Sequence, residues 1–164
     1  MSLTAPSLSA PALEWALYYL RRGWSVVPVR RGEKIPALPW HQFQNRRATE
    51  AEVRDWFSDP TMGVGIVTGT ISNLVVVDFD GDIGAATEQQ LLPRLGAGPV
   101  ALTGGGGCHR FFSHPGKKVP TRKGILPGMD IRGDGGFIVA PPSVHASGRQ
   151  YSWDVDAHVD DLGL

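Results

Sequence analysis

The sequence predicts an α+β fold. Short apolar runs rich in β-branched residues, the pattern of buried strands, are concentrated in the second half of the chain. Helical patterns are fewer and are separated from most of these strands, which favours α+β over an alternating α/β arrangement. The 164 residues suffice for one domain with a core, or for two small lobes that share a cleft. We expect residues 1–11 to form a loose arm and residues 12–164 to form a single domain.

Three segments have helical patterns. In the first, apolar residues recur at helical spacing and Gly23 follows as a stop signal. In the second, Thr49 and Glu52 have the spacing of a capping box, in which each side chain accepts a hydrogen bond from the other residue's backbone N–H. The helices are expected over residues 12–22, 49–57 and 83–95.

The predicted strands are short apolar runs bounded by glycine or polar residues. They cover residues 25–29, 63–68, 74–79, 100–103, 109–113, 129–132, 137–140 and 151–153. Between two of them stands Asp134-Gly135, a dipeptide typical of tight turns between antiparallel strands. We therefore expect residues 129–132 and 137–140 to pair as a hairpin.

Composition excludes several classes of protein. Lysine plus arginine equals aspartate plus glutamate, 16 each, so any contact with nucleic acid must depend on local patches. The single cysteine, Cys108, excludes an internal disulfide and fits a reducing cytoplasm. No apolar stretch reaches 18 residues and the N-terminus lacks a signal-peptide pattern. The sequence thus predicts a cytoplasmic protein with no membrane partner.

Asp78-Phe79-Asp80 is the most informative motif. It ends the apolar run over residues 74–77, and because side chains alternate along a strand, Asp78 and Asp80 share a face with Cα atoms about 6.5 Å apart. Two carboxylates there repel each other and are costly to desolvate. A divalent cation relieves both problems, and oxygen ligands on a rigid strand suit Mg²⁺ or Mn²⁺.

Taken alone, this motif has three other interpretations. The carboxylates could simply be solvated at a strand end. Dehalogenase-like phosphatases carry an apolar strand followed by Asp-x-Asp-x-Thr, in which the first aspartate is the nucleophile, but here Asp82 stands where the threonine belongs. Many glycosyltransferases use Asp-x-Asp to hold a metal and a sugar-nucleotide diphosphate. The rest of the chain has to decide among them.

A run of four glycines, 104–107, precedes Cys108-His109. Such a run lets the backbone approach a ligand closely and point N–H groups at phosphate oxygens. His109 opens the next predicted strand, where its ring would be fixed and able to donate to a phosphate. The alternative is a flexible loop followed by an ordinary histidine. No second pair of ligands has the spacing of a zinc site.

A second acidic motif lies on the strand over residues 129–132. Asp130 and Arg132 share a face of that strand and form either a plain ion pair or a functional unit. In the functional alternative, Asp130 is a third metal ligand and Arg132 holds phosphates. Of two alternatives for Asp134, a turn residue or a ligand, we favour the turn residue.

Basic residues cluster between these motifs. The segment contains Lys117, Lys118, Arg122 and Lys123, which either solvate a loop or follow a nucleic-acid backbone. After the last long strand pattern, Ser143 either lines a cleft and reaches a phosphate or belongs to the end of the hairpin.

Seven segments in this order resemble one family. From about residue 12 to residue 153, the chain is similar to the N-terminal primase–polymerase domain of the archaeo-eukaryotic primase superfamily, found in replication proteins of plasmids, phages and mobile elements. The segments cover residues 23–29, 34–36, 63–69, 77–80, 103–112, 130–136 and 140–143. The dehalogenase interpretation predicts neither the glycine–histidine strand nor the Asp130 strand.

The resemblance implies a two-lobed fold with an RNA-recognition-motif-like catalytic sheet and a smaller α/β N-terminal lobe. It also implies that Asp78, Asp80 and Asp130 hold two divalent cations, Mg²⁺ or Mn²⁺. The family's Ser-x-His motif contacts the phosphates of the incoming nucleotide. Here His109 is the histidine, and Gly107 replaces the serine, so that a backbone N–H would take over its contact.

The implied activity is template-dependent nucleotidyl transfer, a DNA primase/polymerase that makes or extends primers on single-stranded DNA from dNTPs or NTPs. Catalysis would depend on the three aspartates and His109. Phosphates would be bound by Lys34, Arg132, Ser143 and the N–H groups of Gly106 and Gly107. The four basic residues of the 117–123 segment would bind DNA, and a helicase module is an expected neighbour in a longer protein. The alternative is a catalytically weak module that binds nucleotide or single-stranded DNA in a replication-initiation protein.

Overall fold

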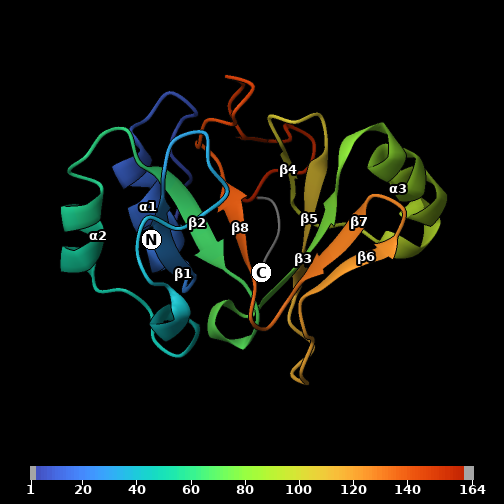
Figure 1. Ribbon diagram of the computed structural model, residues 1–164, viewed down its shortest axis with the longest axis horizontal. Coiled ribbons are helices and arrows are strands. Elements are labelled where there is room, and N and C mark those ends of the chain that lie inside the picture. Colours follow the sequence, from blue (N-terminus) through green and yellow to red (C-terminus); the bar gives the residue numbers. More distant parts are fainter. Residues whose placement is uncertain (1–2, 161–164) are drawn as a thin grey trace.

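Two antiparallel β-sheets, one in each lobe, form the molecule (Figure 1). The computed structural model describes residues 3–160. The smaller sheet has the order β1 (Ser25–Val29), β2 (Gly63–Val67), β8 (Phe137–Ala140). The larger has the order β6 (Arg122–Leu126), β7 (Met129–Arg132), β3 (Leu74–Phe79), β5 (Cys108–Ser113), β4 (Val100–Leu102), β9 (Ser152–Trp153). The predicted α+β class is confirmed.

The helices divide between the lobes. Two of them, α1 (Ala12–Arg21) and α2 (Glu50–Trp56), pack with the smaller sheet, while α3 (Gly81–Leu95) covers the outer face of the larger one (Figure 1). The predicted capping box is confirmed, because Thr49 and Glu52 each accept the other's backbone N–H. Short 3₁₀ helices cover His41–Gln44 and Thr70–Ser72. No helix within residues 3–160 is long and apolar enough to span a membrane.

The predicted hairpin of β7 and β8 is wrong. β7 pairs with β3 and β6, whereas β8 crosses to the other lobe and pairs with β2, with Phe137 opposite Val67. The Asp134-Gly135 pattern did not produce a hairpin because the Asp134 side chain accepts hydrogen bonds from other loops. In addition, Ile138 and Ala140 are buried in the core of the smaller sheet, which draws β8 away from β7.

The partner of β7 is the edge strand β6. Arg122 and Lys123 therefore lie on a strand and not in the loop that the sequence predicts. The β6–β7 connection turns at Gly128, whose φ is 67° and where any side chain would meet the backbone of Gly84 in α3. Because this close approach fixes the turn, β6 lies beside the strand that carries Asp130.

Side chains alternate along β3, so its two faces pack into different core clusters. Leu74 and Val76 belong to one core cluster that the two sheets share, together with aromatic residues of α1, β5 and β9. Val77 and Phe79 face the other way, into the cluster under α3. Asp78 continues the Leu74–Val76 face, so its carboxylate points between the lobes at the point where the shared core ends.

Asp134 joins three loops at one end of the sheets. Its carboxylate accepts hydrogen bonds from the N–H and hydroxyl of Thr70, each 2.9 Å, from the N–H of Val119, 2.9 Å, and lies 3.1 Å from Nε2 of His114. Burial alone would raise the pKa of Asp134, but the N–H groups of Thr70 and Val119 outweigh it and hold that pKa below its usual value. The connection from β7 to β8 is therefore anchored to both lobes.

Replacing Asp134 by alanine should lower the free energy of unfolding by about 2–3 kcal/mol, since several donors lose a charged acceptor. Urea denaturation measures this. Asp59→Ala is the matched control, because among the described residues the Asp59 carboxylate bonds only Thr61, in an exposed turn, and its loss should be clearly smaller. A carboxyl group with a lowered pKa stabilises the folded protein fully above about pH 4 and progressively less below it. The difference in free energy of unfolding between wild type and Asp134→Ala should therefore shrink in acid. Equal losses in the two variants would contradict this role.

Candidate active site

Three neighbouring strands place His109, Asp78 and Asp130 in one row. In the antiparallel register, Asp78 on β3 is directly opposite His109 on β5 and directly opposite Asp130 on β7. Directly opposed residues of neighbouring antiparallel strands have side chains on the same face, with Cβ atoms about 5 Å apart. Residues far apart in the sequence thus meet on the face of the larger sheet that looks toward the other lobe.

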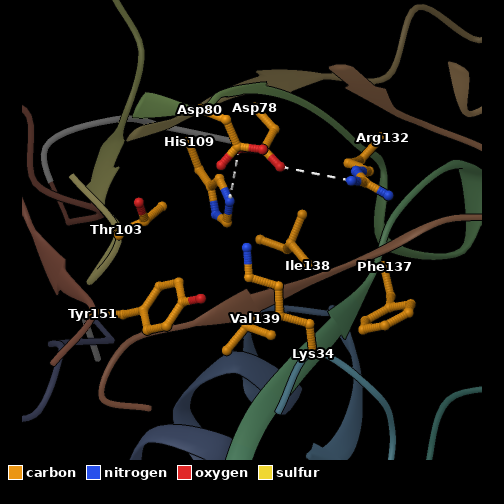
Figure 2. Close-up of a pocket in the computed structure, with 11 residues that line it drawn as sticks. Lys34, Asp78, Asp80, Thr103, His109, Arg132, Phe137, Ile138, Val139 and Tyr151 are labelled. Atoms are coloured by element: carbon orange, nitrogen blue, oxygen red, sulfur yellow. Dashed lines mark ion pairs between the residues drawn. The ribbon is translucent and has the colours of Figure 1, made fainter. Parts of the chain in front are cut away.

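A cavity of about 90 Å³, the interlobe pocket, opens in front of Asp78 and His109 (Figure 2). The larger sheet and its loops contribute polar groups, and β8 of the smaller sheet contributes an apolar wall. The lining residues are Lys34, Asp78, Asp80, Thr103, Gly105, His109, Arg132, Phe137, Ile138, Val139 and Tyr151. Lys34, Asp78, Asp80, His109 and Arg132 were all predicted as site residues, and the structure brings them together.

Asp78 is the buried centre of the pocket. Its side chain lies with Oδ1 3.4 Å from Nε2 of His109 and Oδ2 3.7 Å from Arg132 (Figure 2). Burial alone would raise the pKa of Asp78, but His109, Arg132 and Lys34 outweigh it and the net direction is downward. Asp78 is therefore an ionised carboxylate in a largely desolvated position.

Two buried polar atoms here lack a hydrogen-bond partner among the described residues. They are Oδ1 of Asp78 and Nδ1 of His109. An unsatisfied buried carboxylate oxygen is costly unless a ligand completes it. Asp80, the exposed N-terminal cap of α3, offers a second carboxylate at the same pocket. This oxygen-rich pair fits a hard divalent cation such as Mg²⁺ or Mn²⁺.

Asp130 has partners of its own. Its Oδ2 accepts a 2.8 Å hydrogen bond from Arg132, and its Oδ1 accepts one of 2.8 Å from the N–H of Gly124 in β6. Asp130 is not among the residues that line the interlobe pocket. Within residues 3–160, no three His, Cys, Asp or Glu side chains are gathered as a preformed metal site. In this arrangement Arg132 stands between Asp130 and Asp78.

The glycine loop closes on Thr103. The N–H of Gly107 donates to the hydroxyl of Thr103, 3.1 Å, and the N–H of Gly106 donates to its carbonyl, 3.2 Å. Gly105, not Gly106 or Gly107, lines the pocket. Gly107 is needed for packing, because a side chain there would meet the carbonyl of Phe79 at the end of β3.

Ser143 and the basic segment lie away from the pocket lining. Ser143 is buried, and its hydroxyl accepts the N–H of Val64 and donates to the Val64 carbonyl, so it joins the end of β8 to β2. The four basic residues are exposed, two in the loop after β5 and two on β6. They are Lys117, Lys118, Arg122 and Lys123.

The sequence missed Tyr151, Phe137 and Thr103 as pocket residues. Tyr151 is 3% exposed, and its hydroxyl points into the pocket (Figure 2) without a hydrogen-bond partner among the described residues. Its ring contacts the rings of His109 and His145, whose centroids lie 6.2 and 6.0 Å from its own. The only available signal was a tyrosine that opens the last strand pattern.

Comparison with known families agrees with this geometry. The family model described as "bifunctional DNA primase/polymerase, N-terminal" matches residues 16–162, nearly the whole chain. The chain belongs to this family. The resemblance drawn from the seven segments is thereby confirmed, and membership supports a DNA primase/polymerase type of function. A comparison with curated proteins found no match.

All three tyrosines of the chain should resist ionisation. Burial raises the pKa of Tyr18, Tyr19 and Tyr151. The pKa of Tyr151 rises to about 12, because the negative charges of Asp78 and Asp80 add to the effect of burial. Absorbance at 295 nm should therefore show no phenolate near pH 10 in the folded protein, while the protein unfolded in guanidinium titrates at about 10. A folded-state transition near pH 10 that disappears in Tyr151→Phe would contradict the burial of this hydroxyl beside two carboxylates.

Proposed function

We propose that this chain is a template-dependent nucleotidyltransferase that makes or extends primers on single-stranded DNA, with a dNTP or NTP bound in the interlobe pocket. The observation that carries the proposal is the row of His109, Asp78 and Asp130 across three strands, with Lys34 and Arg132 beside it. Carboxylates beside cations in one open pocket suit a ligand that combines divalent metal with phosphate.

The metal would be held first by Asp78 and Asp80, whose carboxylates line the pocket. Asp130 would join them once its bond to Arg132 is given up. When bound, the two divalent cations would supply charge neutralisation and a more acidic primer 3′-hydroxyl. Two features support this assignment. One buried oxygen of Asp78 has no hydrogen-bond partner among the described residues, and the side chain of Asp80 is exposed and so accessible to a metal ion.

The protein's own groups would manage the phosphates. Lys34 and Arg132 would hold the triphosphate, and the imidazole of His109 would donate to the leaving pyrophosphate. In the step itself, the primer 3′-oxygen forms a bond to the α-phosphorus, and the bond from that phosphorus to pyrophosphate breaks. The 3′-hydroxyl proton leaves to solvent. The neutral phenol of Tyr151 would donate to the nucleotide, because no group among the described residues occupies its hydroxyl.

The template would cross the basic residues at the open edge of the larger sheet. Arg122 and Lys123 lie on β6, next to the strand that carries Asp130, and Lys117 and Lys118 precede it. An exposed basic edge next to the strand of Asp130 would hold a single-stranded backbone through phosphate contacts.

A binding module with weak catalysis is the second candidate. Two observations favour it: Arg132 already neutralises Asp130 and approaches Asp78, and residues 3–160 contain no preformed group of three metal donors. In that case the pocket would bind a nucleotide without transferring it.

Asp78→Asn should abolish nucleotide incorporation and leave the fold intact, because it removes the central charge while keeping the shape. The assay is extension by labelled dNTP with Mn²⁺ on primed and unprimed single-stranded templates. Loss of at least about 100-fold is expected, in line with removal of a main electrostatic contributor to catalysis. Asp82→Asn is the matched control, since Asp82 is exposed in α3 and outside the pocket lining. Wild-type extension by Asp78→Asn would reject the site, and an inactive wild type that binds dNTP would favour the binding module.

Lys117→Ala with Lys118→Ala should weaken binding to a single-stranded oligonucleotide and reduce the slope of log affinity against log salt by about 1.4, since two phosphate contacts are lost. Fluorescence anisotropy at several salt concentrations measures both quantities. Arg21→Ala with Arg54→Ala removes the same charge from α1 and α2, in the other lobe, and should leave the slope unchanged. Equal effects of the two double variants would show a nonspecific charge effect and reject this path for DNA.

A further inference from the structure

The position of Arg132 suggests a role beyond holding phosphates. Its guanidinium lies 2.8 Å from Oδ2 of Asp130 and 3.7 Å from Oδ2 of Asp78, so one cation contacts both carboxylates (Figure 2 shows the longer contact). The two aspartates are opposite each other on neighbouring strands. Like charges in that arrangement repel, and the guanidinium between them offsets the repulsion.

A divalent cation that bridges Asp78 and Asp130 needs the oxygens that Arg132 now holds. The arginine cannot give way by losing its proton, because a guanidinium stays charged at any ordinary pH. It can give way only by turning its side chain out of the space between the two carboxylates. Its side chain is 22% exposed and lines the pocket, so it has room to turn toward the cavity.

We infer that Arg132 is an internal counter-ion, which substitutes for a divalent cation between Asp78 and Asp130 and is released to the triphosphate when that cation binds. The inference rests on the proposed function and adds an order to it. Arg132 opposes the metal when no nucleotide is present and favours the nucleotide once the metal is bound. One guanidinium thus couples the two binding events, because whatever draws it toward phosphate also frees the carboxylates.

Metal binding alone gives the first test. Mn²⁺ binding to the nucleotide-free protein is measured by electron paramagnetic resonance of free Mn²⁺ and by calorimetry. Arg132→Gln should bind Mn²⁺ about tenfold more tightly than wild type, the effect of removing one competing cation at close range. The Mn²⁺ affinity of Arg132→Lys should lie between those of wild type and Arg132→Gln, since lysine keeps the charge but lacks the planar guanidinium that can bond two carboxylate oxygens.

Arg122→Gln is the matched control. It removes one positive charge from the neighbouring strand, where no ion pair to a carboxylate is formed by Arg122 among the described residues. Its Mn²⁺ affinity should stay within about twofold of wild type, because exposed charges act weakly through solvent. An equal gain in Arg122→Gln and Arg132→Gln would reduce the effect to general charge and overturn the inference.

Asp78→Asn separates this inference from the proposed function. If Asp78→Asn abolishes Mn²⁺ binding but Arg132→Gln binds Mn²⁺ no more tightly than wild type, the metal site stands and the counter-ion role is overturned. If Mn²⁺ binding is indifferent to Asp78, the proposed metal site fails and the inference falls with it. Tighter binding by Arg132→Gln that Asp78→Asn abolishes supports both.

The release to phosphate is tested with a non-hydrolysable dNTP at saturating Mn²⁺. Arg132→Gln should bind this analogue about tenfold more weakly than wild type, the reverse of its effect on the metal. Thermal unfolding confirms that the variant folds, and added Mn²⁺ should raise its melting temperature more than that of wild type, because at a given concentration a tighter ligand stabilises the folded state more. Unchanged analogue binding would overturn the transfer of Arg132 from carboxylate to phosphate.

Discussion

The arrangement of the site follows from one desolvated carboxylate at the end of an apolar strand face. Leu74 and Val76 carry that face of β3 into the shared core, and Asp78 follows them with an ionised side chain. Burying such a charge without compensation costs several kcal/mol. The structure compensates with His109 and Arg132 from the two flanking strands, yet one oxygen of Asp78 still has no hydrogen-bond partner among the described residues. This incomplete compensation leaves a position for a cation.

The two-sheet frame keeps this charge at the edge of the core instead of inside it. Because the chain crosses from the larger sheet to the smaller one between β7 and β8, Phe137 and Ile138 form the wall of the pocket opposite Asp78. Asp134 anchors that crossing to loops of both lobes. The apolar wall and the polar row are thus set by one connection, and the cavity between them combines low polarity on one side with concentrated charge on the other.

The sequence predicted the parts that local patterns encode. The valine run before Asp78 predicted the strand and the position of its carboxylate, and the spacing of Thr49 and Glu52 predicted a helix start. Pairing between distant strands is not encoded locally, so the Asp134-Gly135 signal predicted a hairpin that does not exist. Tyr151 was missed for the same reason, because it lines the pocket only through the folding of strands that are distant from it in the sequence. The roles assigned to the aspartates and to His109 stay predictions.

In the proposed function, Asp78 and its neighbours hold divalent metal against a nucleotide in the interlobe pocket. Crystals grown with Mn²⁺ and a non-hydrolysable dNTP test it directly, because manganese is located by its anomalous scattering. We expect anomalous density between the carboxylates of Asp78 and Asp80, with the triphosphate toward Lys34 and the rest of the nucleotide against the aromatic side of the pocket. Manganese found elsewhere, or a nucleotide bound outside this pocket with Asp78 unchanged, would contradict it.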